Sequence, residues 1–172
     1  MKNFLQTLNA NEASQVLTAL LANDPALVEK AYAIATEIVG DANVDEICDD
    51  VYHALNSLDV DDLYSSSGRT RHGYVDPSER AWEMFEEALY PFIDEMKKSQ
   101  QRSLPLEAKI HCIGIIEGLL KYEEKSYSDL KEWVPDALSE GITTVVDEWK
   151  EGNPSSDDIA EVMNIVEEIN HT

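Results

Sequence analysis

The sequence predicts an all-α protein, and three observations carry that prediction. Apolar residues recur every three or four positions over most of the 172 residues, which is the period of an amphipathic helix. No stretch alternates apolar and polar residues over more than a few positions, as a half-buried strand would. No Asn-Gly or Asp-Gly pair offers a tight hairpin turn. About eight amphipathic helices in a single domain, residues 1–172, are therefore expected, either as an α-α superhelix or as an irregular helical bundle.

The first two predicted helices lie on either side of Asp24 and Pro25, a pair that is typical of a helix start. The first helix follows Asn11 as its cap. The second ends at Gly40, which suits a left-handed C-cap. The buried stripes of these two helices are expected to contain Val16, Leu17, Leu20, Leu21, Leu27, Val28, Ala31, Ile34, Ala35, Ile38 and Val39.

The third predicted helix opens at Asn43, and Glu46 three residues later completes a capping box. Its buried stripe is expected to contain Ile47, Val51, Leu55 and Leu58. A short helical turn over residues 60–64 follows, and the serines and glycine of residues 65–68 end the regular pattern. A loop is expected from there to residue 75.

Residues 76–79, with the sequence Asp-Pro-Ser-Glu, form the clearest helix start in the chain because they combine an N-cap, a proline and a capping box. Pro91 is expected to kink this helix. Its apolar face is expected to contain Ala81, Trp82, Phe85, Leu89, Phe92, Ile93 and Met96.

Pro105 starts the next predicted helix, in which Gly114 and Gly118 lie four residues apart and favour a close helix crossing. Its stripe is expected to contain Leu106, Ile110, Ile113, Ile116, Leu119 and Leu120. Two shorter helices are expected over residues 130–138 and 142–149. The last helix is expected to begin at Ser155 or Ser156 and to continue through residue 169.

The strong negative charge excludes several classes of partner. The chain has 35 acidic and 13 basic residues and a formal charge of −22, so it is repelled from nucleic acids and anionic membranes. The longest uncharged stretch, residues 13–23, is far shorter than the roughly 18 residues of a membrane span. Residues 1–15 show no secretory signal pattern. Cys48 and Cys112 are expected in the core of a protein in the reducing cytoplasm.

One segment reverses the local charge. No acidic residue occurs from residue 63 to residue 75, and this span contains Arg69, Arg71 and His72 together with Tyr74. In one interpretation, the two arginines pair with carboxylates of the protein's own surface and fasten the loop. In another, these four residues bind an acidic or phosphorylated partner. An idle loop is the third interpretation.

A family resemblance is carried by the same segment. Residues 69–77, Arg-Thr-Arg-His-Gly-Tyr-Val-Asp-Pro, and residues 81–83, Ala-Trp-Glu, resemble a segment of prokaryotic all-helical proteins of unassigned function, which resemble HEAT-like α-α superhelices. The likeness covers roughly residues 20–150. It implies stacked helix pairs, a fold whose extended surfaces bind partners, and it implies no catalytic residues.

Asp45, Asp49 and His53 lie four residues apart on one predicted helix face and are the candidate metal ligands. The alternative interpretation is a solvated face on which the carboxylates interact with His53. No phosphate-binding loop, dinucleotide fingerprint or nucleophile elbow occurs, and no cofactor is expected. The favoured function is therefore a non-enzymatic scaffold that binds a protein partner. The alternative is a metal- or phosphate-dependent enzyme or factor that uses this helix face or Arg69 and Arg71.

The basic segment is tested by replacing Arg69 and Arg71 together with alanine. If the segment binds a partner, affinity capture of that partner from lysate is lost while the melting temperature stays nearly unchanged. If the arginines fasten the loop, the melting temperature falls instead. Capture followed by mass spectrometry, together with a thermal melt of both proteins, makes the measurement.

Overall fold

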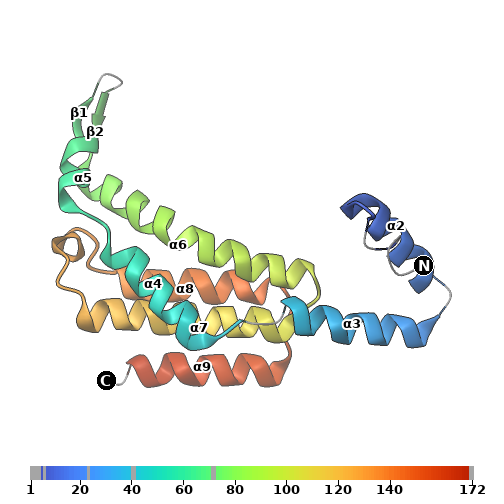
Figure 1. Ribbon diagram of the computed structural model, residues 1–172. Coiled ribbons are helices and arrows are strands. Elements are labelled where there is room, and N and C mark those ends of the chain that lie inside the picture. Colours follow the sequence, from blue (N-terminus) through green and yellow to red (C-terminus); the bar gives the residue numbers. More distant parts are fainter. Residues whose placement is uncertain (1–4, 6, 23, 40–41, 71–72, 171–172) are drawn as a thin grey trace. The chain divides into compact units, whose positions relative to one another are not determined.

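The described residues are mainly helical, which confirms the all-α prediction (Figure 1). The computed structural model describes residues 5, 7–22, 24–39, 42–70 and 73–170, and these contain eight α-helices, one 3-10 turn and one two-stranded hairpin. Within them, no helix is both long and apolar enough to cross a membrane. The chain divides into two compact units, residues 1–41 and 42–172. The expectation of a single domain stays a prediction.

The first unit contains α2 (Ala10–Leu21) and α3 (Pro25–Val39). Asn9, and not the expected Asn11, caps α2. Its side chain accepts a hydrogen bond of 3.0 Å from the backbone N–H of Glu12, and the Glu12 carboxylate accepts one of 3.0 Å in return. The physical reason is that Asn9 has a glutamate three residues later, as a capping box requires, whereas Asn11 does not. The expected C-cap, Gly40, lies outside the described residues.

The apolar stripes of the first unit differ from the prediction in their burial. No residue of α2 is buried, although its apolar spacing predicted a core-facing helix. The large apolar side chains that were expected inside but are exposed in the structure are Val16, Leu17, Leu20, Leu27, Val28 and Ile34. The two helices have the predicted apolar spacing, but the described residues of the first unit leave these side chains exposed.

The second unit contains the remaining elements. In chain order they are α4 (Val44–Asn56), α5 (Val60–Ser66), β1 (Gly68–Thr70), β2 (Gly73–Val75), α6 (Pro77–Gln101), α7 (Pro105–Lys125), the 3-10 turn η1 (Asp129–Glu132), α8 (Ala137–Lys150) and α9 (Ser156–Asn170). Helices α6 to α9 run in alternating directions, and α4 lies along α7 (Figure 1). Helix α7 packs against α4, α6, α8 and α9, so it is the central helix of this unit.

Two predicted helix starts in this unit are confirmed. The Asn43 side chain accepts a hydrogen bond of 2.8 Å from the N–H of Asp45 and caps α4. Asp76 does the same for α6, accepting one of 2.9 Å from the N–H of Ser78. Each cap satisfies N–H groups that have no partner within the first helical turn. Helix α6 continues past Pro91 to Gln101.

The core surrounds α7 and includes residues from every α-helix of the second unit. Its largest fully buried side chains are Trp149, Tyr122, Phe85, Leu55, Leu63, Met96, Ile115, Ile116, Leu119, Leu130, Val51 and Val134. One expected member, Leu106, is 59% exposed, and its neighbour Glu107 is buried instead. The buried face predicted for α7 is therefore displaced by one residue at the first turn of the helix.

The predicted close crossing is confirmed where α4 lies on α7. A β-carbon at Gly114 would lie 2.7 Å from the Cβ of Ile47, and one at Gly118 would lie 2.6 Å from the Cβ of Val51. The latter would also lie 2.9 Å from the carbonyl oxygen of Cys48. These separations are shorter than van der Waals contact, so only glycine lets the two backbones approach this closely.

Two further elements differ from the prediction. The helix predicted over residues 130–138 does not form: residues 129–132 make the 3-10 turn η1, and α8 begins only at Ala137. The helix predicted over residues 142–149 is part of α8, which continues through Gly141 without a break. Strands β1 and β2 form an antiparallel hairpin where a loop was expected. The hairpin needs no Asn-Gly turn: Gly68 has φ of 78° and Gly73 has φ of 135°, conformations that glycine adopts at little cost.

Lysine side chains connect neighbouring helices of the second unit. Lys109 on α7 forms ion pairs of 2.7 Å with Asp158 and 2.9 Å with Glu161, both on α9. Lys121, also on α7, pairs with Asp49 on α4. These contacts use some of the few basic side chains of an acidic chain, so many carboxylates elsewhere are left without an ion-pair partner.

Replacing Gly118 with alanine is expected to destabilise the second unit by about 1–3 kcal/mol, because the added methyl group overpacks the crossing. In a helix free of such contacts the same exchange would stabilise by up to about 1 kcal/mol. Gly141→Ala is the comparison, since its β-carbon would lie 3.1 Å from the flexible end of Leu119 and 3.5 Å, an ordinary contact distance, from the Cζ atom of Phe85. Urea unfolding followed by tryptophan fluorescence measures both variants. An equal or smaller loss for Gly118→Ala would contradict the role assigned to the crossing.

Candidate functional site

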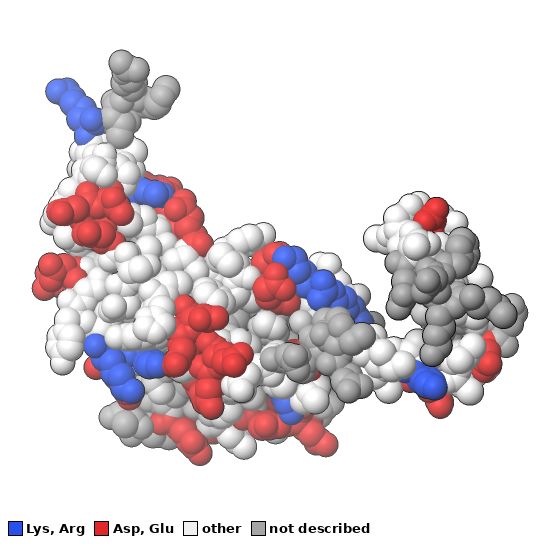
Figure 2. Space-filling view, viewed as in Figure 1, with Lys and Arg blue, Asp and Glu red and all other residues white. Residues whose placement is uncertain are grey.

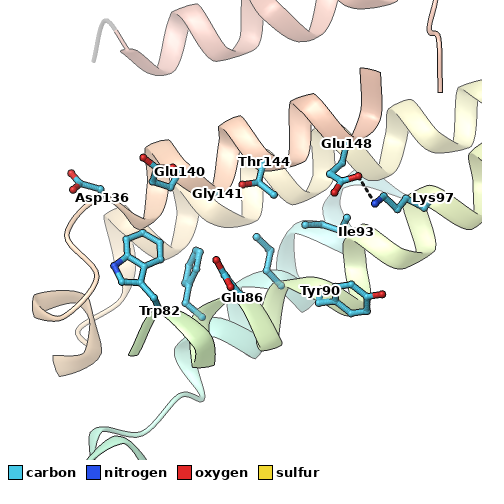
Figure 3. A pocket seen from close by; sticks show the side chains of 12 residues that line it. Trp82, Glu86, Tyr90, Ile93, Lys97, Asp136, Glu140, Gly141, Thr144 and Glu148 are labelled. Atoms are coloured by element: carbon cyan, nitrogen blue, oxygen red, sulfur yellow. Dashed lines mark ion pairs between the residues drawn. The ribbon is translucent and has the colours of Figure 1, made fainter. Parts of the chain in front are cut away.

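A groove lies between α6 and α8 (Figure 3). It has a volume of about 480 Å³, within the usual range for binding pockets. Its lining combines apolar, aromatic and acidic side chains with a single lysine. Figure 3 shows Trp82, Glu86 and Tyr90 of α6 on one side and Asp136, Glu140 and Thr144 on the other.

The floor of the groove is apolar and comes from one stripe of α6. Trp82, Phe85, Leu89 and Ile93 follow one another at helical spacing and all line it. Phe85, Leu89 and Ile93 are buried, with exposed fractions of 2%, 3% and 7%. Trp82 is half-buried and stacks edge-on against Phe85, with ring centroids 5.8 Å apart. The floor therefore offers an aromatic surface at its Trp82 end and an aliphatic one beyond it.

Carboxylates form the rim. Asp136 and Glu140 lie one turn apart at the start of α8, and Glu86 faces them from α6. None of these three forms an ion pair with a described residue. At the other end, Lys97 of α6 pairs with Glu148 of α8, and this hydrogen bond raises the pKa of Lys97. The rim therefore has a net negative charge, and one of its carboxylates, Glu148, is neutralised by Lys97.

This combination suits a ligand that is apolar on one side and positively charged on the other. A desolvated apolar floor binds aliphatic or aromatic groups, and unneutralised carboxylates attract cations. The lining residues include no histidine, cysteine or serine, and Thr144 is their only hydroxyl besides that of Tyr90. The carboxylates, together with Lys97 and Tyr90, are therefore the ionisable groups of the groove.

The predicted metal ligands are not brought together. Asp49 pairs with Lys121, and this hydrogen bond lowers the pKa of Asp49. Asp45 and His53 are exposed on α4, where the ring of His53 stacks edge-on against Tyr52 at 5.3 Å. Among the described residues, no group of three or more histidine, cysteine, aspartate or glutamate side chains is placed to hold a metal ion.

The basic segment forms part of the hairpin. Arg69 of β1 lies opposite Tyr74 of β2, and both side chains are exposed. Arg69 forms no ion pair with a described residue, so the interpretation in which it fastens the loop is not supported for this arginine. Arg80 pairs with Glu83 at 2.9 Å and with Glu87 at 3.2 Å on its own helix, and its Nε atom donates a hydrogen bond of 3.3 Å to the Oγ atom of Ser66 on α5. Arg71 and His72 lie outside the described residues.

The groove was not predicted from the sequence. Phe85 is buried in the core as predicted, and Trp82 is partly buried against the core, but both side chains also line the groove. The signal that could have found the rim is the spacing of Asp136, Glu140 and Glu148, which recur at multiples of four on one helix. Because the segment was predicted as two helices, the three carboxylates were not recognised as lying on one helix face.

Comparisons with family models, with curated proteins and with solved structures give no match to this chain. The groove and the hairpin therefore have to be interpreted from their own geometry and charge.

Two buried polar groups lie outside the groove, on the first turns of α7. Glu107 is buried, and neither its Oε2 atom nor the Nδ1 atom of His111 has a hydrogen-bond partner among the described residues. Burial lowers the pKa of His111, and the charges of Glu107 and Glu95 oppose part of that effect. The folded protein therefore favours the neutral imidazole.

This preference predicts a pH dependence. The imidazole of the unfolded chain takes up a proton near its ordinary pKa of about 6.5, above the pKa in the folded protein. The unfolded state then binds more protons, so the contribution of neutral His111 to the free energy of unfolding decreases as the pH falls through that value. The stability difference between the native protein and His111→Gln should shift in favour of the variant between about pH 7.5 and pH 5.5. His53→Gln is the exposed control in the same urea titrations, and a pH-independent difference for His111 would contradict the prediction.

Proposed function

We propose that this chain is a protein-interaction module whose groove between α6 and α8 binds a basic amphipathic segment of a partner protein. The observation that carries the proposal is an apolar floor bordered by carboxylates that have no ion-pair partner among the described residues. The partner would place apolar side chains on Phe85 and Leu89 and lysine or arginine side chains beside Asp136 and Glu140. Recognition of this kind is the helix-in-groove mode of peptide binding.

The dimensions of the groove support a short helix as the bound element. Its α8 side extends from Asp136 to Glu148, a rise of about 18 Å, which corresponds to about three helical turns. A helix of that length presents apolar residues at positions i, i+3, i+4 and i+7 on one face. Lysine or arginine side chains at the two edges of that face would lie beside the carboxylates of α6 and α8 that border the groove.

The net charge of the protein supports a basic partner and opposes a nucleic acid. A potential set by −22 formal charges attracts cationic segments over distances of a Debye length and speeds their association. Figure 2 shows acidic side chains over much of the visible face, with basic side chains gathered in a few places. Two free cysteines are consistent with a location in the cytoplasm, which we propose as well.

The basic segment is a second proposed contact. Arg69 and Tyr74 lie side by side on the hairpin, with no described ion pair to occupy Arg69, and could engage an acidic part of a partner. Together with Arg71 and His72, they keep the role that the sequence suggested. The resemblance of the sequence to HEAT-like scaffolds, whose extended surfaces bind partners, also supports partner binding.

The groove is tested with a synthetic peptide probe of about 14 residues that carries leucine at i, i+3, i+4 and i+7 and lysine on the other face. Fluorescence anisotropy of the labelled peptide measures its affinity for the full chain. Glu140→Lys is expected to weaken binding by about tenfold or more, because it places a like charge beside the lysines of the peptide. Thr144→Trp is expected to do the same by filling the groove without changing the net charge.

Matched controls separate the groove from general attraction to an acidic surface. Glu124→Lys makes the same change in net charge at an exposed position of α7 that does not line the groove, and Ser139→Trp adds the same ring at an exposed position of α8 outside the lining. Both should leave the affinity within about twofold of the native value. Equal weakening by Glu140→Lys and Glu124→Lys would contradict the proposal, as would tight binding to the Thr144→Trp variant. Thermal melts of each variant monitor folding.

A further inference from the structure

The exposed large apolar side chains of the first unit are concentrated on two consecutive helices. The N-terminal apolar surface consists of Val16, Leu17, Leu20, Leu27, Val28, Tyr32 and Ile34. Leu17, Leu20 and Tyr32 are exposed by 50%, 55% and 53%. In the second unit, the exposed large apolar side chains are mostly single tyrosines on different elements, which is ordinary for a protein surface. Within the described residues of the first unit, the apolar faces of α2 and α3 are thus left largely exposed.

The size of this surface is suited to a protein interface. Its seven side chains expose on the order of 600 Å², against roughly 800 Å² buried per partner in an interface of standard size. A monomer seldom exposes a larger apolar patch without a functional reason. Leaving such a surface in water forfeits stabilisation that packing against another apolar surface would provide.

The charges of the first unit indicate what kind of surface covers it. Residues 10–39 contain four carboxylates and one lysine, Lys30. An anionic membrane or a nucleic acid would need basic side chains around the apolar stripe, and these are lacking. A basic protein segment would need an acidic rim like that of the groove. By helical spacing, Glu12 lies one turn before Val16, and Lys30 lies one turn from both Leu27 and Ile34, so charges of both signs border the apolar stripes.

A surface with little charge is compatible with a second copy of itself. In an isologous interface each residue meets the same surface of the other copy, so a strongly charged face would repel itself. Of the formal charge of −22, residues 1–41 contribute two lysines against five carboxylates, and residues 42–172 contribute the rest. The first unit is therefore the part of the chain on which two acidic copies can meet with the least repulsion.

We infer that the chain forms a homodimer in which α2 and α3 of two copies pack their apolar stripes against each other, giving four helices around a shared apolar core. The contact uses the ridges-into-grooves packing of ordinary helix pairs and requires no residue of the groove. Each dimer then presents two copies of the groove, so a partner with two basic segments would bind with avidity. The inference goes beyond the proposed function, because dimerisation does not depend on what the groove binds.

Sedimentation equilibrium of the full chain tests the dimer over about 1 to 100 µM. The native protein should show twice the mass of 19.3 kDa at the upper end of that range. Leu17→Glu should raise the dissociation constant by about 100-fold or more, because each dimer loses two buried leucines and gains two buried charges. Val28→Glu on α3 should have a similar effect. Neither exchange lowers helix propensity, so a lost dimer would not be explained by an unfolded helix.

Gln15→Glu is the matched control, since it adds the same charge on the opposite side of α2 and should leave the dissociation constant within about threefold of the native value. Tryptophan fluorescence monitors the fold of the second unit, because Trp82, Trp133 and Trp149 all belong to it. A native protein that stays monomeric at every concentration would overturn the inference. Equal weakening by Leu17→Glu and Gln15→Glu would overturn it too. Peptide binding in the groove is measured separately, so failure of one proposal is distinguishable from failure of the other.

Discussion

The close approach of α4 to α7 is the constraint on which the rest of the second unit depends. Gly114 and Gly118 let the backbone of α4 lie against α7 with only hydrogen atoms between them, and Ile47 and Val51 fill the space that larger residues would need. Helix α7 then lies between α4 on one side and α6, α8 and α9 on the others. A helix surrounded in this way has to be apolar around most of its circumference, which explains why Cys112 and Ile115 are buried as well as the predicted stripe.

The groove follows from this arrangement. Helices α6 and α8 both pack on α7, and Gly141, which lines the groove, lets α8 approach Leu119 and Phe85 closely. The α6 stripe therefore continues from the core into the open, with Phe85 inside and Trp82 at the edge. The charge of the rim has a separate origin. Basic side chains such as Lys109 and Lys121 are used in ion pairs between helices, so the carboxylates of the rim have few candidates for neutralisation.

The two units use amphipathic helices in different ways. In residues 42–172, the apolar stripes meet one another and form a core. In residues 1–41, equally regular stripes on α2 and α3 remain exposed. Helical periodicity indicates that one face of a helix is apolar, but it does not indicate which molecule or element covers that face. The contrast in charge between the units, and not their periodicity, distinguishes a surface suited to a basic ligand from one suited to a copy of itself.

The sequence by itself determined the fold class, most helix starts and a close helix crossing at Gly114 and Gly118, because caps, prolines and glycines act through local backbone geometry that neighbouring residues specify. Asn43 and Asp76 are examples of such caps. Only the tertiary structure decided that α4 is the helix that crosses there, which apolar residues are buried and where the groove lies, because these depend on partners distant in the chain. The spacing of Asp136, Glu140 and Glu148 is present in the sequence, but their alignment along the groove depends on α8 continuing through Gly141. The hairpin around Arg69 likewise forms from glycine conformations that the sequence permits but does not require.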